Sequence, residues 1–266
     1  MIKKPKSITK FSDNSKQQTR IRFANGTFLY PLSVIVIITI IWQLAVSFKI
    51  VDAFLLPSPI AVIKALIKDA KLLLKHSTYT LCAGIVGLLL SVITAYIIAI
   101  VMDRFSFLNK AVYPILVMSQ TIPAIAIAPL LVLWLGYGML SKTVLVMMTC
   151  FFPLTVSILT GFGSADPDAL ILLKSMGANK NQILYHIKLP ESLSHFFAGL
   201  KVSVSYSIVS AVIAEWIGGA MGLGVYMTRV KKTYAFDKMF AVVFIIVIIS
   251  LILIEAVKFL EKKYLR

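Results

Sequence analysis

The sequence predicts an all-α polytopic membrane protein with six transmembrane helices. Of its 266 residues, 59% are hydrophobic and only 14% are charged, whereas soluble domains average about 45–50% apolar and about 25% charged residues. Five apolar runs reach the roughly 20 residues that a spanning helix needs, and a sixth is more polar but long enough. Basic residues gather in tails and loops beside these runs. The bilayer is therefore expected to surround most of the chain.

These runs form one predicted transmembrane domain, residues 28–258, between a basic tail (1–27) and a short C-terminal tail (259–266). The spans are expected at about 28–48, 80–102, 111–135, 143–162, 196–218 and 239–257. The third contains Pro114, Pro123 and Pro129, so it is predicted to be kinked or broken. Backbone groups freed at such a break need protein partners or a water-lined cavity.

The orientation follows from the loops. If the polar loop 163–195 is cytoplasmic, six spans place both termini in the cytoplasm. Seventeen of the 27 Lys and Arg residues then lie on the inner side, in agreement with the positive-inside rule.

Two basic segments fall on the outer side in this topology. Lys64, Lys68, Lys71 and Lys75 recur at helical spacing, which predicts one amphipathic helix in the outer interface after a turn at residues 56–59. A seventh, partial span is the alternative, but so many charges are costly in hydrocarbon. The glycine-rich residues 218–224 and the basic residues 229–232 are expected to form the last outer loop.

Several kinds of chemistry are excluded. The net charge of +16 is explained by anionic lipid headgroups, and no nucleic-acid-binding signature accompanies it. No phosphate-binding P-loop, zinc-protease motif or serine-nucleophile motif occurs, so no cofactor is expected on this chain. His76, His186 and His195 are too scattered for a metal site, and Cys82 and Cys150 lie in apolar runs as packing residues.

The polar loop 163–195 begins with a predicted short helix. Asp166 is placed to cap its start, Pro167 suits its first turn, and Gly177 suits a left-handed exit at its end. So much local structure is unusual for a linker.

A second short helix is predicted to follow. Asn179 and Gln182 have the spacing of a capping box, and Leu189-Pro190 is expected to end this helix. The whole loop is therefore interpreted as a docking element for a cytoplasmic partner.

The loop resembles the cytoplasmic signature of bacterial ABC-importer permeases, E-A-A-x-x-x-G, nine residues, then I-x-L-P. Gly177, Ile187, Leu189 and Pro190 match this spacing. The departure is at residues 171–173, where Ile-Leu-Leu replaces Glu-Ala-Ala, so the family's glutamate contact does not carry over to this chain.

Other motifs resemble the nitrate/sulfonate/taurine-type branch of these permeases. They lie at residues 56–62, 121–123, 128–138 and 222–224. Residues 119–123, 211–218 and 224–232 are most similar to permeases for pyrimidine precursors of thiamine, such as hydroxymethylpyrimidine.

The resemblance implies a type I ABC importer permease of the MetI-like fold in a bacterial cell membrane. Two copies would form the pathway, two separate ATPase subunits would bind ATP-Mg, and an extracytoplasmic binding protein would deliver solute. The chain itself would be a transport subunit and not an enzyme. The coupling element is expected to use Asp168, Leu172, Lys174, Met176, Gly177, Ala178, Ile187, Leu189 and Pro190.

Polar residues within two spans are the candidate pathway. In the proline-rich span these are Ser119, Gln120, Thr121 and Pro123, and the Gln120 amide offers the donor and acceptor that a pyrimidine requires. An interhelical hydrogen bond is the alternative role.

The span 196–218 supplies the others, Ser203, Tyr206, Ser207, Ser210 and Glu215. The serines share a helical face, which fits either pathway lining or close helix packing. Glu215 is expected to act at the outer gate or to position the glycine-rich loop, with a purely structural hydrogen bond as the alternative.

Three other functions are alternatives to this one. The same machinery could carry an aliphatic sulfonate, taurine or nitrate, although an anion favours basic donors and Lys201 is the only deep basic residue. An ion-coupled secondary transporter would rest on buried acids such as Glu215, but the docking loop argues against it. A structural scaffold would not need a proline-broken, polar-lined bundle.

Overall fold

The computed structural model describes residues 29–265, and all regular secondary structure in this range is helical. The predicted basic tail 1–27, the first residue of the first predicted span and the last residue of the C-terminal tail lie outside the described residues. The chain divides into two units, residues 1–60 and 61–266.

In the first unit, helix α2 (Leu29–Ser47) is mostly apolar and carries no charged residue. A turn follows it, in which the Asp52 carboxylate accepts a hydrogen bond from the Phe54 N–H at 2.9 Å. The Leu55 and Leu56 N–H groups donate to the Asp52 carbonyl. Side-chain and backbone acceptors of one aspartate thus hold this turn.

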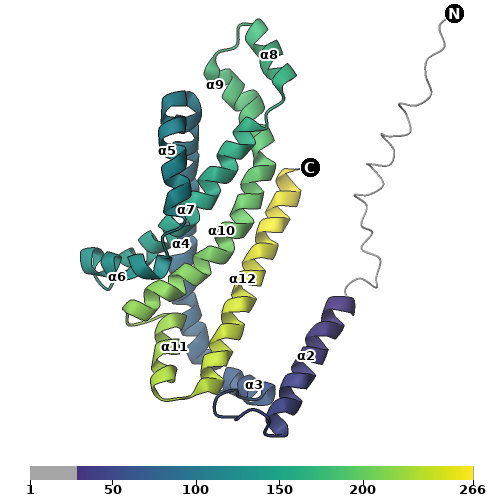
Figure 1. Ribbon diagram of the computed structural model, residues 1–266, viewed down its shortest axis with the longest axis vertical. Coiled ribbons are helices and arrows are strands. Elements are labelled where there is room, and N and C mark those ends of the chain that lie inside the picture. The colour runs from purple at the N-terminus through teal and green to yellow at the C-terminus, as the bar shows by residue number, and fades with distance from the viewer. Residues whose placement is uncertain (1–28, 266) are drawn as a thin grey trace, which may run out of the picture. The chain divides into compact units, whose positions relative to one another are not determined.

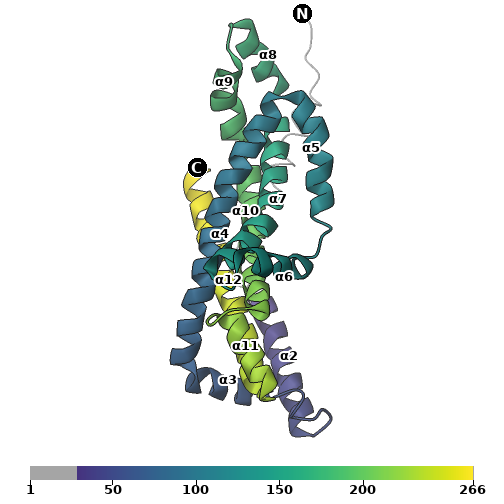
Figure 2. The ribbon, with the colours of Figure 1, turned by 90° about the vertical axis from the view of Figure 1, so that its left-hand side faces the viewer.

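The longest helices of the second unit are α4 (Ala70–Arg104), α7 (Met139–Gly163), α10 (Leu189–Ile217) and α12 (Phe236–Tyr264). Figures 1 and 2 show α8 and α9 projecting from one end of this unit, while α11 lies toward the other end. We call the end with α8 and α9 the loop end, after the polar loop 163–195. We call the end with α11 the glycine-loop end, after residues 218–224.

Small residues let three of these helices pack closely. A Cβ atom on Gly87 of α4 would lie 2.6 Å from the Val146 side chain of α7. A Cβ atom on Gly161 of α7 would lie 2.7 Å from Ser192 of α10. Small residues at such contacts allow helix backbones to approach, which is the main source of helix association in a bilayer. The core of the unit is therefore the α4–α7–α10 seam.

The proline-rich run is broken, as its composition predicted. Helix α5 (Ser106–Ser119) and helix α6 (Ala124–Leu135) are separated by four residues and bent by 99°. Pro123 has extended backbone angles and has no N–H to continue the helix. Within residues 29–265, five helices are long and apolar enough to cross a membrane, and the bent pair makes a sixth span if it is counted as one.

The polar loop folds into α8 (Pro167–Ser175) and α9 (Lys180–Ile183), with the predicted caps in place. The prediction that Leu189-Pro190 ends the second helix was wrong. A wide π-helical turn, η1 (Leu184–Lys188), carries the chain from α9 into α10 without interruption. The Leu189 N–H reaches back to the Leu184 carbonyl, and this wider turn makes room for the ring of Pro190.

The prediction of one amphipathic helix with a stripe of four lysines was also wrong. The segment breaks at Asp69, so Lys64 and Lys68 lie on α3 (Pro59–Lys68), while Lys71 and Lys75 begin α4. Asp69 accepts a hydrogen bond from the Tyr226 hydroxyl at 2.7 Å and pairs with Lys238 at 2.7 Å. Three elements thus meet at this one carboxylate.

The segment predicted as the last outer loop is partly helical. Helix α11 (Leu223–Lys232) begins inside the glycine-rich stretch and ends with the basic residues. Its apolar side packs against Leu73 and Val242 through Leu223, Tyr226 and Val230.

Candidate functional site

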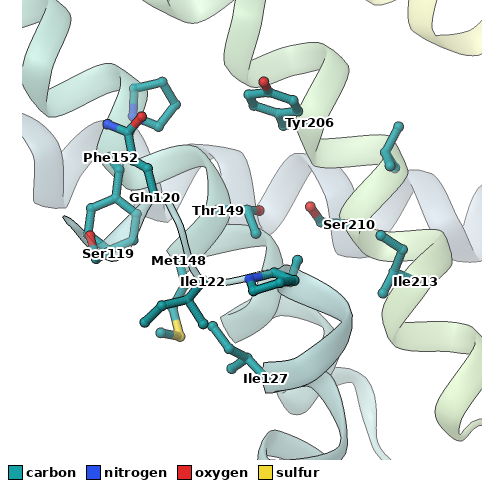
Figure 3. A pocket seen from close by; sticks show the side chains of 14 residues that line it. Ser119, Gln120, Ile122, Ile127, Met148, Thr149, Phe152, Tyr206, Ser210 and Ile213 are labelled. Atoms are coloured by element: carbon teal, nitrogen blue, oxygen red, sulfur yellow. The ribbon is translucent and has the colours of Figure 1, made fainter. Parts of the chain in front are cut away.

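A pocket of about 360 Å³ lies at the break between α5 and α6, and we call it the central pocket (Figure 3). Helices α7 and α10 supply its other walls. Its polar lining groups include Gln120, Thr149, Tyr206 and Ser210, and its apolar lining includes Ile122, Ile127, Met148, Phe152 and Ile213.

Three of its polar groups are free to bind a solute. Within the described residues, neither the Gln120 amide, the Tyr206 hydroxyl nor the Ser210 hydroxyl makes a hydrogen bond, whereas the Thr149 hydroxyl donates to carbonyls of its own helix. Figure 3 shows Thr149 and Ser210 facing each other across the pocket. No charged side chain lines it among the described residues. A mostly apolar wall with a few polar groups is typical of small-molecule sites.

A second group of polar residues lies at the glycine-loop end, around Glu215 of α10. Three consecutive backbone N–H groups of the loop each donate to a different side chain: Gly222 to His76 at 3.0 Å, Leu223 to Thr80 at 2.9 Å and Gly224 to Glu215 at 2.8 Å. The Thr80 hydroxyl also donates to Glu215 at 2.9 Å. These bonds satisfy the free N–H groups at the start of α11.

Lys142, near the start of α7, belongs to the same cluster. Its side chain and that of Glu215 are each only 1% exposed. The Lys142 ammonium donates to the Met221 carbonyl at 3.3 Å and lies 5.2 Å from the centre of the Tyr79 ring. A buried acid and a buried base therefore hold the glycine loop from two sides, because Glu215 accepts from the Gly224 N–H and Lys142 donates to the Met221 carbonyl.

The α8 helix forms a third candidate site, at the loop end. None of its residues is buried. Ile171 and Leu172 are each 62% exposed and Met176 is 75% exposed. We call these three side chains the docking face, because exposed apolar patches of this kind usually mark a protein contact.

Both ends of α8 are fixed by local hydrogen bonds. Asp166 caps the first turn by accepting from the Asp168 N–H at 3.0 Å. At the other end, the Gly177 N–H donates to the Lys174 carbonyl and the Ala178 N–H to the Leu173 carbonyl, the Schellman pattern, with Gly177 at φ +81°. The shape of the docking element is therefore set by its own sequence.

Contacts with α4 and α10 hold this element against the bundle. Lys188 pairs with Asp103 at 2.5 Å, and Arg104 donates to the Asn181 side chain at 2.7 Å. The Asp166 N–H donates to Glu191 at the start of α10. Ile187, predicted as part of the coupling element, is buried beneath it; Leu189 is half-buried, and Pro190 is exposed at the first turn of α10.

The structure brings five predicted pathway residues together at the central pocket: Ser119, Gln120, Pro123, Tyr206 and Ser210. It places the other four elsewhere. The Thr121 hydroxyl donates to the Met118 carbonyl, the Ser203 hydroxyl to the Cys150 carbonyl and the Ser207 hydroxyl to the Val204 carbonyl. Glu215 lies in the glycine-loop cluster.

Sequence reasoning missed the contribution of α7 to the pocket. Met148, Thr149 and Phe152 lie in an apolar run whose pattern does not show which face meets a cavity. A signal was present in Pro153, which lies inside this helix and also lines the pocket. Prolines within spans accompany cavities because the freed carbonyls need partners.

Comparison with known proteins shows which family this chain resembles. Residues 85–266 match the family described as binding-protein-dependent transport system inner membrane component. A probable ABC transporter permease protein from Haemophilus influenzae is 35% identical over 89% of this chain and 97% of its own length. The formylaminopyrimidine transport permease protein ThiX from Halalkalibacterium halodurans is 34% identical over 88% of this chain and 93% of its own.

Relatives at 25 to 28% identity carry names for riboflavin, aliphatic sulfonates and taurine. Among solved structures, a chain of the inward-facing MetNI methionine ABC transporter superposes with a TM-score of 0.66 at 17% identity, over 74% of this chain and 98% of that one. That likeness shows the type I importer permease fold. The chain therefore belongs to the binding-protein-dependent transport system inner membrane component family and is a permease subunit of an ABC importer.

Proposed function

We propose that this permease carries a small neutral heteroaromatic solute, a pyrimidine precursor of thiamine similar to hydroxymethylpyrimidine. The observation that carries the proposal is the central pocket, which joins two aromatic side chains, Phe152 and Tyr206, to the free Gln120 amide. The ring of a heteroaromatic solute can stack on Phe152 or Tyr206. The Gln120 amide offers a donor and an acceptor to the ring nitrogens and amino groups of such a solute. The relative named for formylaminopyrimidine, 34% identical, supports the same class.

An aliphatic sulfonate, taurine or nitrate is the second candidate, because relatives named for the first two share 25 and 26% identity. These solutes carry an anionic group, for which charge-assisted donors such as Arg or Lys are the usual protein partners. The absence of a charged side chain among the described residues of the pocket favours the neutral ring.

In the proposed cycle, a binding protein delivers the solute at the glycine-loop end, and a separate ATPase subunit binds ATP-Mg at the loop end. The docking face of α8 inserts into the ATPase, and two copies of the permease form the pathway between them. Closure of the ATPases on ATP then draws the two α8 helices together and opens the bundle at the opposite end.

In this proposal, both chain termini lie in the cytoplasm of a bacterial cell. An ion-coupled transporter is disfavoured, because the Glu215 carboxylate already accepts hydrogen bonds from the Thr80 hydroxyl and the Gly224 N–H.

The test is reconstitution in proteoliposomes with the cognate ATPase and binding protein. ATP-dependent uptake of labelled hydroxymethylpyrimidine, in excess over taurine, is the expected result. Uptake of taurine instead would keep the importer and reject the solute class, and uptake that follows a proton gradient without ATP would reject the ATP-driven cycle.

A matched pair of variants tests the coupling element in the same assay. Gly177→Asn and Gly177→Asp have nearly the same shape, and both residues tolerate the left-handed backbone at φ +81° better than most. We expect uptake to survive in the asparagine variant and to fall in the aspartate variant, because an unpaired charge is costly in a buried interface. Equal uptake by both would remove residue 177 from the ATPase contact.

A further inference from the structure

A separate pocket lies at the loop end, between α4 and the docking element. Its volume is about 230 Å³, and helix α4, both short helices of the loop and the π-helical turn line it. We call it the loop-end pocket. It is distinct from the central pocket, with which it shares no lining residue.

The loop-end pocket is strongly basic. Arg104, Lys174, Lys180 and Lys188 line it, and among the described residues Asp103 is the one acidic side chain in its lining. Lys188 already pairs with that carboxylate at 2.5 Å. Within the described part of the chain, the other three cations have no carboxylate partner, so the pocket keeps an excess positive charge that a bound anion would neutralise.

The rest of the wall is apolar. Ile100 lies in the last turns of α4, just before Asp103 and Arg104, and Leu170 and Leu184 face the same cavity from the loop. The basic groups thus lie where an apolar membrane helix ends. A phosphate diester attached to hydrocarbon fits both parts of this wall, whereas free phosphate would leave the apolar part without a partner.

The pocket also lies away from the docking face. Leu170 and Lys174 line it and are four residues apart, so they share one side of α8. Leu172 and Met176 of the docking face are two residues further along, which turns them by about 200° around the helix. One side of α8 can therefore meet a protein while the other holds a small anion.

We propose that the loop-end pocket binds the phosphate group of an anionic phospholipid, held by Arg104, Lys174 and Lys180. A lipid bound there would tie α8 to the inner end of α4 and set the stiffness of the docking element. The lipid site does not depend on the proposed solute. Its regulatory consequence rests on the proposed role of α8 in coupling.

The test measures lipid binding to the purified full-length chain by native mass spectrometry in a neutral detergent. Phosphatidylglycerol and phosphatidylcholine are added in turn, and inorganic phosphate is added as a competitor. The variant Lys174→Gln/Lys180→Gln removes two charges from the pocket. Lys262→Gln/Lys263→Gln removes the same charge from the exposed end of α12, outside the pocket.

We expect preferential retention of phosphatidylglycerol, no competition by millimolar phosphate, and a loss of affinity of roughly 10- to 30-fold in the pocket variant alone. An equal loss of phosphatidylglycerol affinity in both variants would show that lipid binding depends on general surface charge and not on the pocket. Competition by free phosphate would make the ligand a soluble anion. Unchanged lipid binding in the pocket variant, with weakened binding of the ATPase subunit, would assign the cations to the protein contact instead. The lipid assay contains neither solute nor ATP, so its failure and a failure of the transport proposal are separate results.

Discussion

At the scale of single residues, three backbone N–H groups attach the glycine loop to the neighbouring helices. Each of Gly222, Leu223 and Gly224 donates to a side chain on α4 or α10. The partners lie 9 to 146 residues away in the sequence. The loop therefore holds α4, α10 and α11 together at one end of the bundle, and its glycines are needed for this close approach.

Gly222→Ala is the first prediction at this scale. Gly222 has φ +125°, and a Cβ atom there would overlap the Glu215 carboxylate. Backbone strain of this kind costs about 1–3 kcal/mol, so we expect a clear fall in the thermal unfolding temperature of the detergent-purified protein. Gly163→Ala is the control, because its Cβ would meet nothing within 4 Å. Equal stability of the two variants would contradict the assigned loop conformation.

Tyr206 is the second residue with a specific prediction. It is 51% exposed, lines the central pocket and has no hydrogen-bond partner among the described residues. If its ring stacks on the solute, Tyr206→Ala removes an interaction worth about 1–3 kcal/mol and lowers ATP-dependent uptake of the pyrimidine roughly fivefold or more. Tyr206→Phe keeps the ring and most of the uptake. Initial rates in proteoliposomes measure both, and equal loss in the two variants would assign the hydroxyl, and not the ring, to the solute.

At the scale of elements, the junction of α3, α4, α11 and α12 is organised by one carboxylate. The hydrogen bond from Lys238, followed by that from the Tyr226 hydroxyl, lowers the pKa of Asp69 below its ordinary value of 3.8. Burial, and then the Asp69 carboxylate, raise the pKa of Tyr226, so this phenol stays neutral and donates across the acidic and neutral range.

The junction predicts a defined loss of stability in acid. The pKa of Asp69 is lower in the folded protein than in the unfolded chain. The stabilisation of the folded protein by the ionised carboxylate is therefore complete above the unfolded pKa of about 3.8. It is lost as the pH falls below that value toward the folded pKa. The unfolding temperature of the wild type should therefore exceed that of Asp69→Asn at neutral pH, and the two should converge as the pH falls below about 3.8. A difference that stays the same at neutral pH and well below pH 3.8 would exclude the carboxylate as the cause.

A substitution in the docking face of α8 should weaken binding of the ATPase subunit without changing the stability of the permease. Leu172 is 62% exposed and α8 buries no residue, so Leu172→Asp should leave the unfolding temperature nearly unchanged. Its binding to the ATPase subunit should weaken by roughly 30-fold, as for a central apolar contact of about 2 kcal/mol. Leu172→Met keeps the apolar contact and serves as the control. Surface plasmon resonance measures both, and unchanged affinity in the aspartate variant would place the contact elsewhere.

At the scale of the whole molecule, the sequence predicted what is local and missed what is distant. The caps at Asp166 and Asn179 involve residues within three positions, so their pattern was readable. The bond between Thr80 and Glu215 joins residues 135 apart. No local pattern records such a pair, and only the packing of α4 against α10 creates it.

The misplaced boundaries have a similar cause. Pro190 is a strong local signal for a helix end, but the η1 turn accommodates it because the helix continues into the packed bundle. The lysine spacing predicted a continuous helix, but the segment breaks at Asp69, which Tyr226 and Lys238 contact from two other helices. In both places tertiary contacts overrode the local preference.

The last prediction concerns the seam that holds the bundle together. Gly87 and Gly84 lie one turn apart on α4, but their surroundings differ. A Cβ atom on Gly87 would lie 2.6 Å from the branched Val146 side chain and 2.8 Å from the Thr143 carbonyl, whereas one on Gly84 would meet the flexible tip of Ile208 at 3.1 Å. Backbone and branched atoms cannot move aside, so Gly87→Ala should force α4 and α7 apart and cost about 1–3 kcal/mol.

Gly84→Ala should cost less, because the Ile208 tip can rotate away. Thermal unfolding of the two variants in the same detergent gives the comparison, and the seam predicts the larger fall for Gly87→Ala. Because α7 also packs against α10 through Gly161 and Gly199, separating α4 from α7 should disturb the central pocket and reduce uptake as well. Equal stability of the two variants, or normal uptake with a loosened seam, would show that α4 is not part of the rigid frame on which the pocket depends.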